Sequence, residues 1–214
     1  MINTKTIAVI GGTGKSGKYV VRELLKKGYH LKVLVRNPKK FTLHSPLAQV
    51  VEGNVGHPET LRELLTGCTS VISALGIGIP QSKHTIFTTA TRIIIPLVAE
   101  FKMERYIVIS GLHVDTPLDK KRLDTQMKTE WMYANYAVST KDKQKEFELL
   151  DQSDIDWTLL RLPLIELTDE RHNISVSLED CPGEKIGATD LAHFLIRQLD
   201  DTSFSKKAPF LANV

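Results

Sequence analysis

The sequence has few cysteines and no long hydrophobic run, and each absence argues against a class of protein. Two cysteines among 214 residues cannot form a disulfide framework, and they do not stand in a C-x-x-C pair. Cys68 is expected to be buried before a strand, and Cys181 to be more exposed. No apolar run reaches the roughly 18 residues of a membrane span, and the opening stretch MINTKTIAVIGG is expected to be a strand entering a turn, not a signal peptide. We therefore expect a cytoplasmic protein without a membrane partner.

The sequence also has little excess of one charge and no cluster of metal-ligating residues. The 28 Lys and Arg residues stand against 25 Asp and Glu residues, which gives a formal net charge of +3. That excess is too small to indicate a nucleic-acid partner, which needs a long basic stripe. The seven histidines show no H-x-x-x-H or similar spacing, so no metal site is expected. The local basic group of Arg36, Lys39 and Lys40 instead indicates a small anionic ligand.

Short apolar runs alternate with amphipathic stretches along the chain. The runs predict strands at residues 6–10, 30–35, 49–52, 70–74, 105–110 and 157–162. The amphipathic stretches predict helices at residues 15–27, 58–65, 85–101, 141–150 and 189–199, with a kink or break at Pro96. This alternation indicates one α/β domain over residues 1–214, a Rossmann-type doubly wound parallel sheet in the order 3-2-1-4-5-6 with helices on both faces. The irregular segments 112–140 and 165–187 follow late strands and are expected to be the substrate walls.

The first strand is followed by a glycine-rich turn, GGTGKSG, that opens a helix. Gly11 permits the tight turn, Gly14 lets the backbone approach a pyrophosphate, and Gly17 lets the helix pack close to the strand. The helix N-terminus then offers N–H groups and partial positive charge to the phosphates. Because the pattern stands after a strand and before a helix, it predicts a dinucleotide-binding site.

Two other interpretations of this turn fit less well. Residues 12–18 match the P-loop pattern G-x-x-x-x-G-K, but Tyr19 stands where magnesium needs Ser or Thr. A nucleophile elbow has glycines two residues before and two residues after its serine, and neither Ser16 nor Ser110 has both. The dinucleotide interpretation is therefore preferred.

The end of the second strand indicates which dinucleotide is bound. An NAD site places a carboxylate there for the ribose 2′-hydroxyl, whereas an NADP site places an arginine for the 2′-phosphate. Here the strand ends in VRNPKK, which carries Arg36 and no acid. A guanidinium can donate paired hydrogen bonds to a phosphate dianion, which a carboxylate would repel. NADP(H) is therefore the expected cofactor.

Seven segments of the chain carry a resemblance to a known family. They are GGTGKSGKYVV, LVRNP, VVEGNVGHPETL, SVISALG, RYIVISG, DWTLLRLP and IGATDLAHFLIRQL. In order and spacing they resemble the atypical short-chain dehydrogenase/reductases. The sequence is most similar to the NmrA-like and biliverdin-IXβ (flavin) reductase-like NAD(P)H-binding proteins. The resemblance covers nearly the whole chain.

The resemblance implies a row of cofactor contacts at the carboxyl ends of the strands. These are Thr13, Gly14, Lys15 and Ser16 at the pyrophosphate, Arg36 at the 2′-phosphate, Asn54 and Val55 beside the adenine, Ala74, Leu75 and Gly76 beside the ribose, and Leu162 and Pro163 after the sixth strand. It also implies that Ser110 faces the nicotinamide. The family usually has Asp at position 54 and Arg-Pro at positions 162 and 163, whereas here Arg161 stands one place earlier.

The sequence lacks the tyrosine–lysine pair of ordinary short-chain dehydrogenases. In Y-x-x-x-K the two side chains lie one helical turn apart, and the lysine lowers the pKa of the tyrosine that passes a proton to a carbonyl. No tyrosine here has a lysine four residues on. Counted back from DWTLLR, Lys143 takes the lysine position, and Ser139, a poor acid, takes the tyrosine position. The candidate catalytic residues are therefore Ser110, His113, Tyr136 and Lys143.

The flavin reductase-like branch also lacks the tyrosine–lysine pair. The resemblance therefore indicates hydride transfer to a small conjugated acceptor such as a flavin or quinone, and the proton would come from solvent. One alternative is an NmrA-like sensor that binds NADP(H) without turnover. Another is carbonyl or nucleotide-sugar chemistry that recruits Tyr136. The group Trp131, Met132, Tyr133 and Tyr136 is expected to stack on a flat acceptor, to pack locally or to form an oligomer contact. We expect a monomer or a homodimer.

Overall fold

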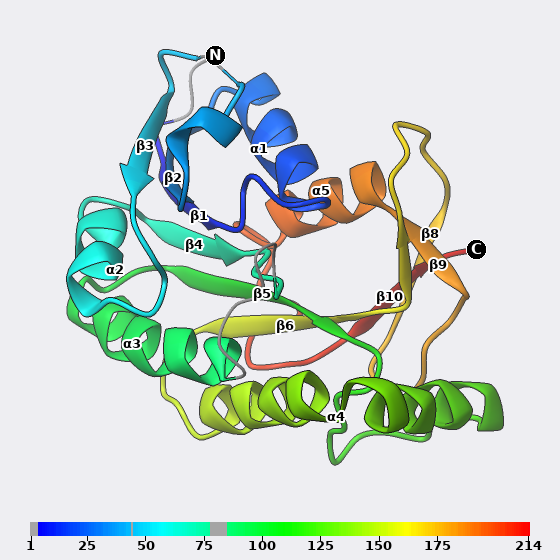
Figure 1. The fold of residues 1–214 in the computed structure, drawn as a ribbon. Coiled ribbons are helices and arrows are strands. Elements are labelled where there is room, and N and C mark those ends of the chain that lie inside the picture. The colour runs from blue at the N-terminus through cyan, green and yellow to red at the C-terminus, as the bar shows by residue number, and fades with distance from the viewer. Residues whose placement is uncertain (1–3, 44, 78–84) are drawn as a thin grey trace.

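Eight strands form the central sheet of the computed structural model, which describes residues 4–43, 45–77 and 85–214 (Figure 1). Their spatial order is β3-β2-β1-β4-β5-β6-β10-β8. In that order they span Ala48–Glu52, His30–Val35, Thr6–Ile10, Ser70–Ser73, Arg105–Gly111, Trp157–Leu162, Phe210–Asn213 and Ile174–Ser177. The first six confirm the predicted order 3-2-1-4-5-6. Beyond them, β10 pairs parallel with β6, and β8 pairs antiparallel with β10.

Helices cover both faces of the sheet (Figure 1). One face carries α1 (Gly17–Lys26) and α5 (Ala188–Arg197), and the other carries α2 (Pro58–Leu65), α3 (Ile86–Glu100) and α4 (Leu123–Asp151). In β1, Ile7 and Val9 pack toward α1 and α5, Ala8 and Ile10 pack on the opposite side, and all four are fully buried. Continuous apolar strands are expected where a parallel sheet is covered on both faces.

The long helix α4 corrects the prediction that residues 112–140 are irregular, because it begins at Leu123. Its backbone leaves helical geometry at Tyr136, with φ −136° and ψ 37°. Two carbonyl groups near this kink accept side-chain hydrogen bonds, the first from Ser139 Oγ to Tyr136 at 3.1 Å and the second from Thr140 Oγ1 to Met132 at 3.2 Å. The first half of α4 escaped prediction because its buried face carries threonines and its apolar side chains point outward.

The segment 165–187 was also wrongly predicted to be irregular. It contains β8 and most of a separate parallel pair, β7 (Leu164–Glu166) and β9 (Lys185–Gly187). These strands are three or four residues long, too short to show a period.

In α3 the helix continues through Pro96 without interruption. Within the described residues, no helix is both long enough and apolar enough to cross a membrane.

The two cysteines are free thiols, and both are buried. Cys68 packs in the core beside α2 and β4, as predicted. Cys181 was predicted to be more exposed, and this is wrong, because it packs against Leu112, Phe210 and Ala212. Burial raises the pKa of both thiols, so neither is primed as a thiolate.

Candidate functional site

The glycine turn lies where β1 and β4 leave the sheet side by side. The strand order reverses between them, and α/β sheets bind ligands in the crevice at the carboxyl ends of such a pair. Gly11 has φ +76°, and a Cβ atom on it would lie 2.3 Å from the carbonyl oxygen of Ala74. A Cβ atom on Gly17 would lie 2.1 Å from the carbonyl oxygen of Gly11. Both positions therefore require glycine, and the turn touches the end of β4.

The N-terminus of α1 opens onto this crevice. Thr13, Gly14 and Lys15 are exposed, and the first turn of the helix carries no acidic residue. Ser16, at the N-cap, makes no side-chain cap. Among the described residues, no acceptor binds the backbone amides of Lys15, Ser16 and Gly17. Amides that lack such an acceptor at the positive end of a helix fit a diphosphate.

Arg36 follows the last residue of β2 and is exposed. The chain then turns through Asn37, whose side-chain oxygen accepts a hydrogen bond from the Lys39 amide at 3.1 Å, into a short 3₁₀ helix at Pro38–Lys40. Arg36 thus stands at the carboxyl end of the strand next to β1, as the sequence predicts for a residue near the adenosine ribose.

The other predicted cofactor residues follow the carboxyl ends of β3, β4 and β6. Asn54 is exposed, but its side-chain oxygen already accepts the Gly56 amide at 3.0 Å. Val55 is buried in the core on the α2 side, which leaves its backbone to meet a ligand. The residues after β4 become progressively more open, from half-buried Ala74 and Leu75 to exposed Gly76, whereas those at the end of β6, Leu162 and Pro163, are buried.

Lys143 lies on the second half of α4, and its ammonium group is committed to the protein. It donates to the Ile109 carbonyl at 2.8 Å and to Glu146 Oε2 at 2.7 Å, and it lies over the Phe87 ring at 3.9 Å from the centroid. Glu146 also accepts from Thr91 Oγ1 at 3.1 Å. This buried set fixes the end of β5 against α4. Sequence analysis missed Glu146, although its place three residues after Lys143 predicts a neighbour on the helix.

Ser110 and His113 lie at and just beyond the end of β5, and both are buried. The Ser110 hydroxyl and the His113 Nε2 atom have no hydrogen-bond partner in the described part of the chain. Burial, reinforced by the charges of Lys143 and Lys121, lowers the pKa of His113 to about 4. The imidazole is therefore neutral near pH 7. Among the described residues eight buried side-chain polar atoms lack a partner, and these two lie where the nicotinamide is expected.

The structure does not bring Tyr136 to Lys143. Tyr136 is half-exposed at the kink of α4, with its ring edge-on to Trp131 at a centroid distance of 5.6 Å. Ser139, in the tyrosine position of the family motif, donates its hydroxyl to the Tyr136 carbonyl. In the described residues, no tyrosine hydroxyl contacts the Lys143 ammonium group.

Arg161 is the buried residue whose role sequence analysis missed. Its guanidinium donates to both carboxylate oxygens of Asp119, at 2.6 and 2.8 Å, and lies 3.6 Å from the centroid of the Phe210 ring. It also donates to three backbone carbonyls, those of Val114, Leu178 and Ala208. One side chain thus joins β6 to both predicted substrate walls and to the segment before β10. A charged residue within the apolar run of β6 is the sequence signal that marks it.

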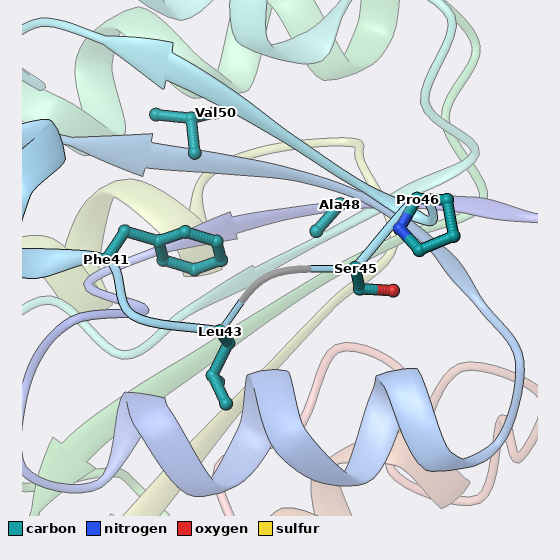
Figure 2. Close-up of a pocket in the computed structure, with 6 residues that line it drawn as sticks. All are labelled: Phe41, Leu43, Ser45, Pro46, Ala48 and Val50. Carbon is teal, nitrogen blue, oxygen red and sulfur yellow. The ribbon is translucent and has the colours of Figure 1, made fainter.

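A pocket of about 430 Å³ lies at the β3 edge of the sheet (Figure 2). Its lining is apolar apart from one serine and consists of Phe41, Leu43, Ser45, Pro46, Ala48 and Val50. The pocket contains none of the predicted cofactor residues. In the described residues, no group of three or more His, Cys, Asp and Glu side chains could hold a metal ion.

Comparison with known proteins agrees with this geometry. A family model described as NAD(P)H-binding matches residues 11–202. The chain belongs to the NAD(P)H-binding family. The predicted resemblance to a family of NAD(P)H-binding proteins is thereby confirmed.

Two proteins with similar sequences come from different organisms. Photosystem II assembly factor Ycf39 of Cyanophora paradoxa is 24% identical over 207 residues, which cover 91% of this chain and 59% of that protein. The uncharacterized protein YwnB of Bacillus subtilis strain 168 is 27% identical over 158 residues, 72% of this chain and 70% of that one. The chain therefore spans little more than half of the assembly factor's length.

Solved structures share the fold across nearly the whole chain. A candidate NADH-flavin reductase from Streptococcus pneumoniae TIGR4 has a TM-score of 0.78 at 22% identity and covers 98% of this chain and 100% of that one. A short-chain dehydrogenase/reductase from Veillonella parvula DSM 2008, in complex with NADP, has a TM-score of 0.73 at 15% identity, covering 98% and 94%. At these identities the likeness supports the fold alone.

Proposed function

We propose that this chain is an NADPH-dependent reductase that transfers hydride to a small conjugated acceptor, of the flavin or quinone kind. The observation that carries the proposal is the end of β5, where a carbonyl reductase would place its proton donor. Lys143 is committed there to Glu146 and to the Ile109 carbonyl, and on α4 a serine, Ser139, stands in the tyrosine position that the family resemblance implies. A conjugated acceptor stabilises the added negative charge itself, so its proton can come from water.

The residues for the cofactor support the same proposal. The backbone amides of Lys15, Ser16 and Gly17, which bind no acceptor among the described residues, would hold the pyrophosphate, and Arg36 would hold the 2′-phosphate. When bound, NADPH would supply the hydride. The Ser110 hydroxyl and the Nε2 atom of the neutral His113 imidazole have no partner among the described residues, and they would donate or accept hydrogen bonds that orient the carboxamide or the acceptor. The two free, buried thiols are compatible with a reducing, cytoplasmic setting.

Replacing Arg36 with alanine is expected to weaken NADPH binding about tenfold to a hundredfold and to leave NADH binding nearly unchanged. The reason is that a charge-assisted hydrogen bond to phosphate contributes about 1.5–3 kcal/mol, and NADH has no 2′-phosphate. Calorimetric titration of both dinucleotides measures the two changes. Lys145→Ala, which removes an exposed positive charge from α4 and leaves the basic turn intact, is the matched control and should change either affinity little. Equal weakening of NADPH and NADH by Arg36→Ala would place the 2′-phosphate elsewhere.

A second candidate function is a sensor that binds NADP(H) without turnover. The ion pair of Lys143 with Glu146 also favours a sensor, because it leaves no lysine to activate a proton donor. A similar protein is named as an assembly factor. Anaerobic mixing of the protein with NADPH and either FMN or a quinone, followed by the absorbance of the reduced nicotinamide, separates the two. Oxidation of one equivalent supports the reductase, and binding without oxidation supports the sensor.

The pH dependence of that reaction tests whether a protein side chain acts as the proton donor. Because the pKa of His113 is lowered to about 4, it stays neutral from about pH 6 to about pH 8, and the rate of hydride transfer should be flat across that range. Tyr136→Phe should keep the rate. A rate that falls with rising pH and is lost in Tyr136→Phe would instead assign the acid to Tyr136.

A further inference from the structure

The outer face of α4 carries an apolar stripe that no other element of the described residues covers. Leu123, Met127, Trp131 and Val138 are between 52% and 72% exposed. Thr125, on the opposite side of the helix, is buried against the protein. Large apolar side chains recurring at helical spacing on a solvent face mark an interaction surface.

The stripe also contains a preformed hole. A pocket of about 350 Å³ is lined by Asp124, Met127, Lys128 and Trp131. These residues stand at i, i+3, i+4 and i+7, which are the neighbouring positions on one helix face that form the hole for a knob from a facing helix. The geometry points to a second helix as the occupant.

We propose that the α4 stripe is a homodimer interface in which two copies of this chain pack antiparallel, with Met127 of each copy filling the hole of the other. The stripe is symmetric about Met127, since Leu123 precedes it and Trp131 follows it by the same four residues. A two-fold axis at Met127 therefore lays Leu123 against the partner's Trp131. The contact is isologous, as closed dimers require.

The charges beside the stripe fit the same arrangement. In an antiparallel helix pair each flank faces the same flank of the partner. Asp124 and Lys128 share one flank, so each Asp124 lies opposite the partner's Lys128, which also binds Glu184 of its own chain at 2.7 Å. Gln126 and Glu130 share the other flank and can form a hydrogen bond across the axis. This interface does not depend on the proposed function, because it lies on the outer face of α4.

Analytical ultracentrifugation of the whole chain tests the interface. Wild type is expected to sediment as a dimer in the micromolar range. Met127→Glu should weaken dimerisation at least about tenfold, because it places a charge on the two-fold axis. Leu164→Glu, at an exposed leucine on β7, is the matched control and should leave the dimer intact. A monomeric wild type would overturn the proposal, even if the stripe then bound phospholipid vesicles or another protein.

Disulfide cross-linking tests the orientation independently. The native thiols of Cys68 and Cys181 are buried, so cross-links under mild oxidation report the introduced residues. Met127→Cys should form an intermolecular disulfide, Leu123→Cys alone should not, and the double variant Leu123→Cys/Trp131→Cys should. No cross-link in Met127→Cys would overturn the interface, and a cross-link in Leu123→Cys alone would overturn the antiparallel arrangement.

Discussion

Arg161→Met is expected to lower the free energy of unfolding by about 3–5 kcal/mol, the range for removing one partner of a buried ion pair. Arg161 is fully buried, and its loss removes its hydrogen bonds to three carbonyl groups and to the Asp119 carboxylate, which keeps those from the Thr116 amide and hydroxyl. Lys121, 3.7 Å from Asp119, compensates only partly. Burial lowers the pKa of Arg161, and the charge of Asp119 opposes that shift. Urea unfolding followed by circular dichroism measures the loss.

Arg62→Met is the matched control for this prediction. Arg62 also donates two hydrogen bonds to one carboxylate, that of Glu100, at 2.6 and 2.8 Å, but both side chains are about half-exposed. Exposed pairs of this kind contribute less than about 1 kcal/mol. The double variant Arg161→Met/Asp119→Leu should recover part of the stability, because it removes the stranded charge. Similar losses for Arg161→Met and Arg62→Met would show that burial does not set the effect.

Gly11→Ala is expected to weaken NADPH binding at least about a hundredfold, because one added carbon displaces the turn that holds the diphosphate. The new Cβ atom would lie 2.3 Å from the Ala74 carbonyl oxygen, so either the turn or the end of β4 must move. The positive φ of +76° adds strain for any side chain. Calorimetric titration with NADPH, together with urea unfolding, measures both consequences.

Gly67→Ala separates strain from crowding. Gly67 has nearly the same φ, +73°, but a Cβ atom there meets nothing within 4 Å. The Gly67→Ala substitution should lower the free energy of unfolding by about 1–2 kcal/mol through backbone strain alone, and it should leave dinucleotide binding unchanged. Binding by Gly11→Ala at wild-type affinity would show that the turn does not hold the pyrophosphate.

The sheet and the glycine turn could be predicted because their signals are local. An apolar run such as residues 6–10 reveals a strand covered on both faces, and three spaced glycines reveal a close approach of backbone. The first half of α4 gave no such signal, because Thr125 and Thr129 are buried there while Met127 and Trp131 face outward.

The partners of buried polar groups could not be predicted for a different reason. Arg161 binds carbonyls that lie 47 residues before it and 47 residues after it, and no short-range pattern encodes such contacts. Cys181 stands in the polar stretch EDCPGE, which suggests exposure, yet it is buried against Phe210, a residue distant in the same sequence. The sequence therefore predicts which strand each site residue follows, whereas only the structure shows its hydrogen bonds.

The position of β10 has a consequence for synthesis on the ribosome. It lies between β6 and β8, although both precede it in the sequence, and within the described residues β8 pairs with β10 alone. The far edge of the sheet therefore cannot close until residues 210–213 have been translated, whereas the strands around the glycine turn are already complete. A nascent chain can thus meet its dinucleotide before the opposite edge of the molecule has folded.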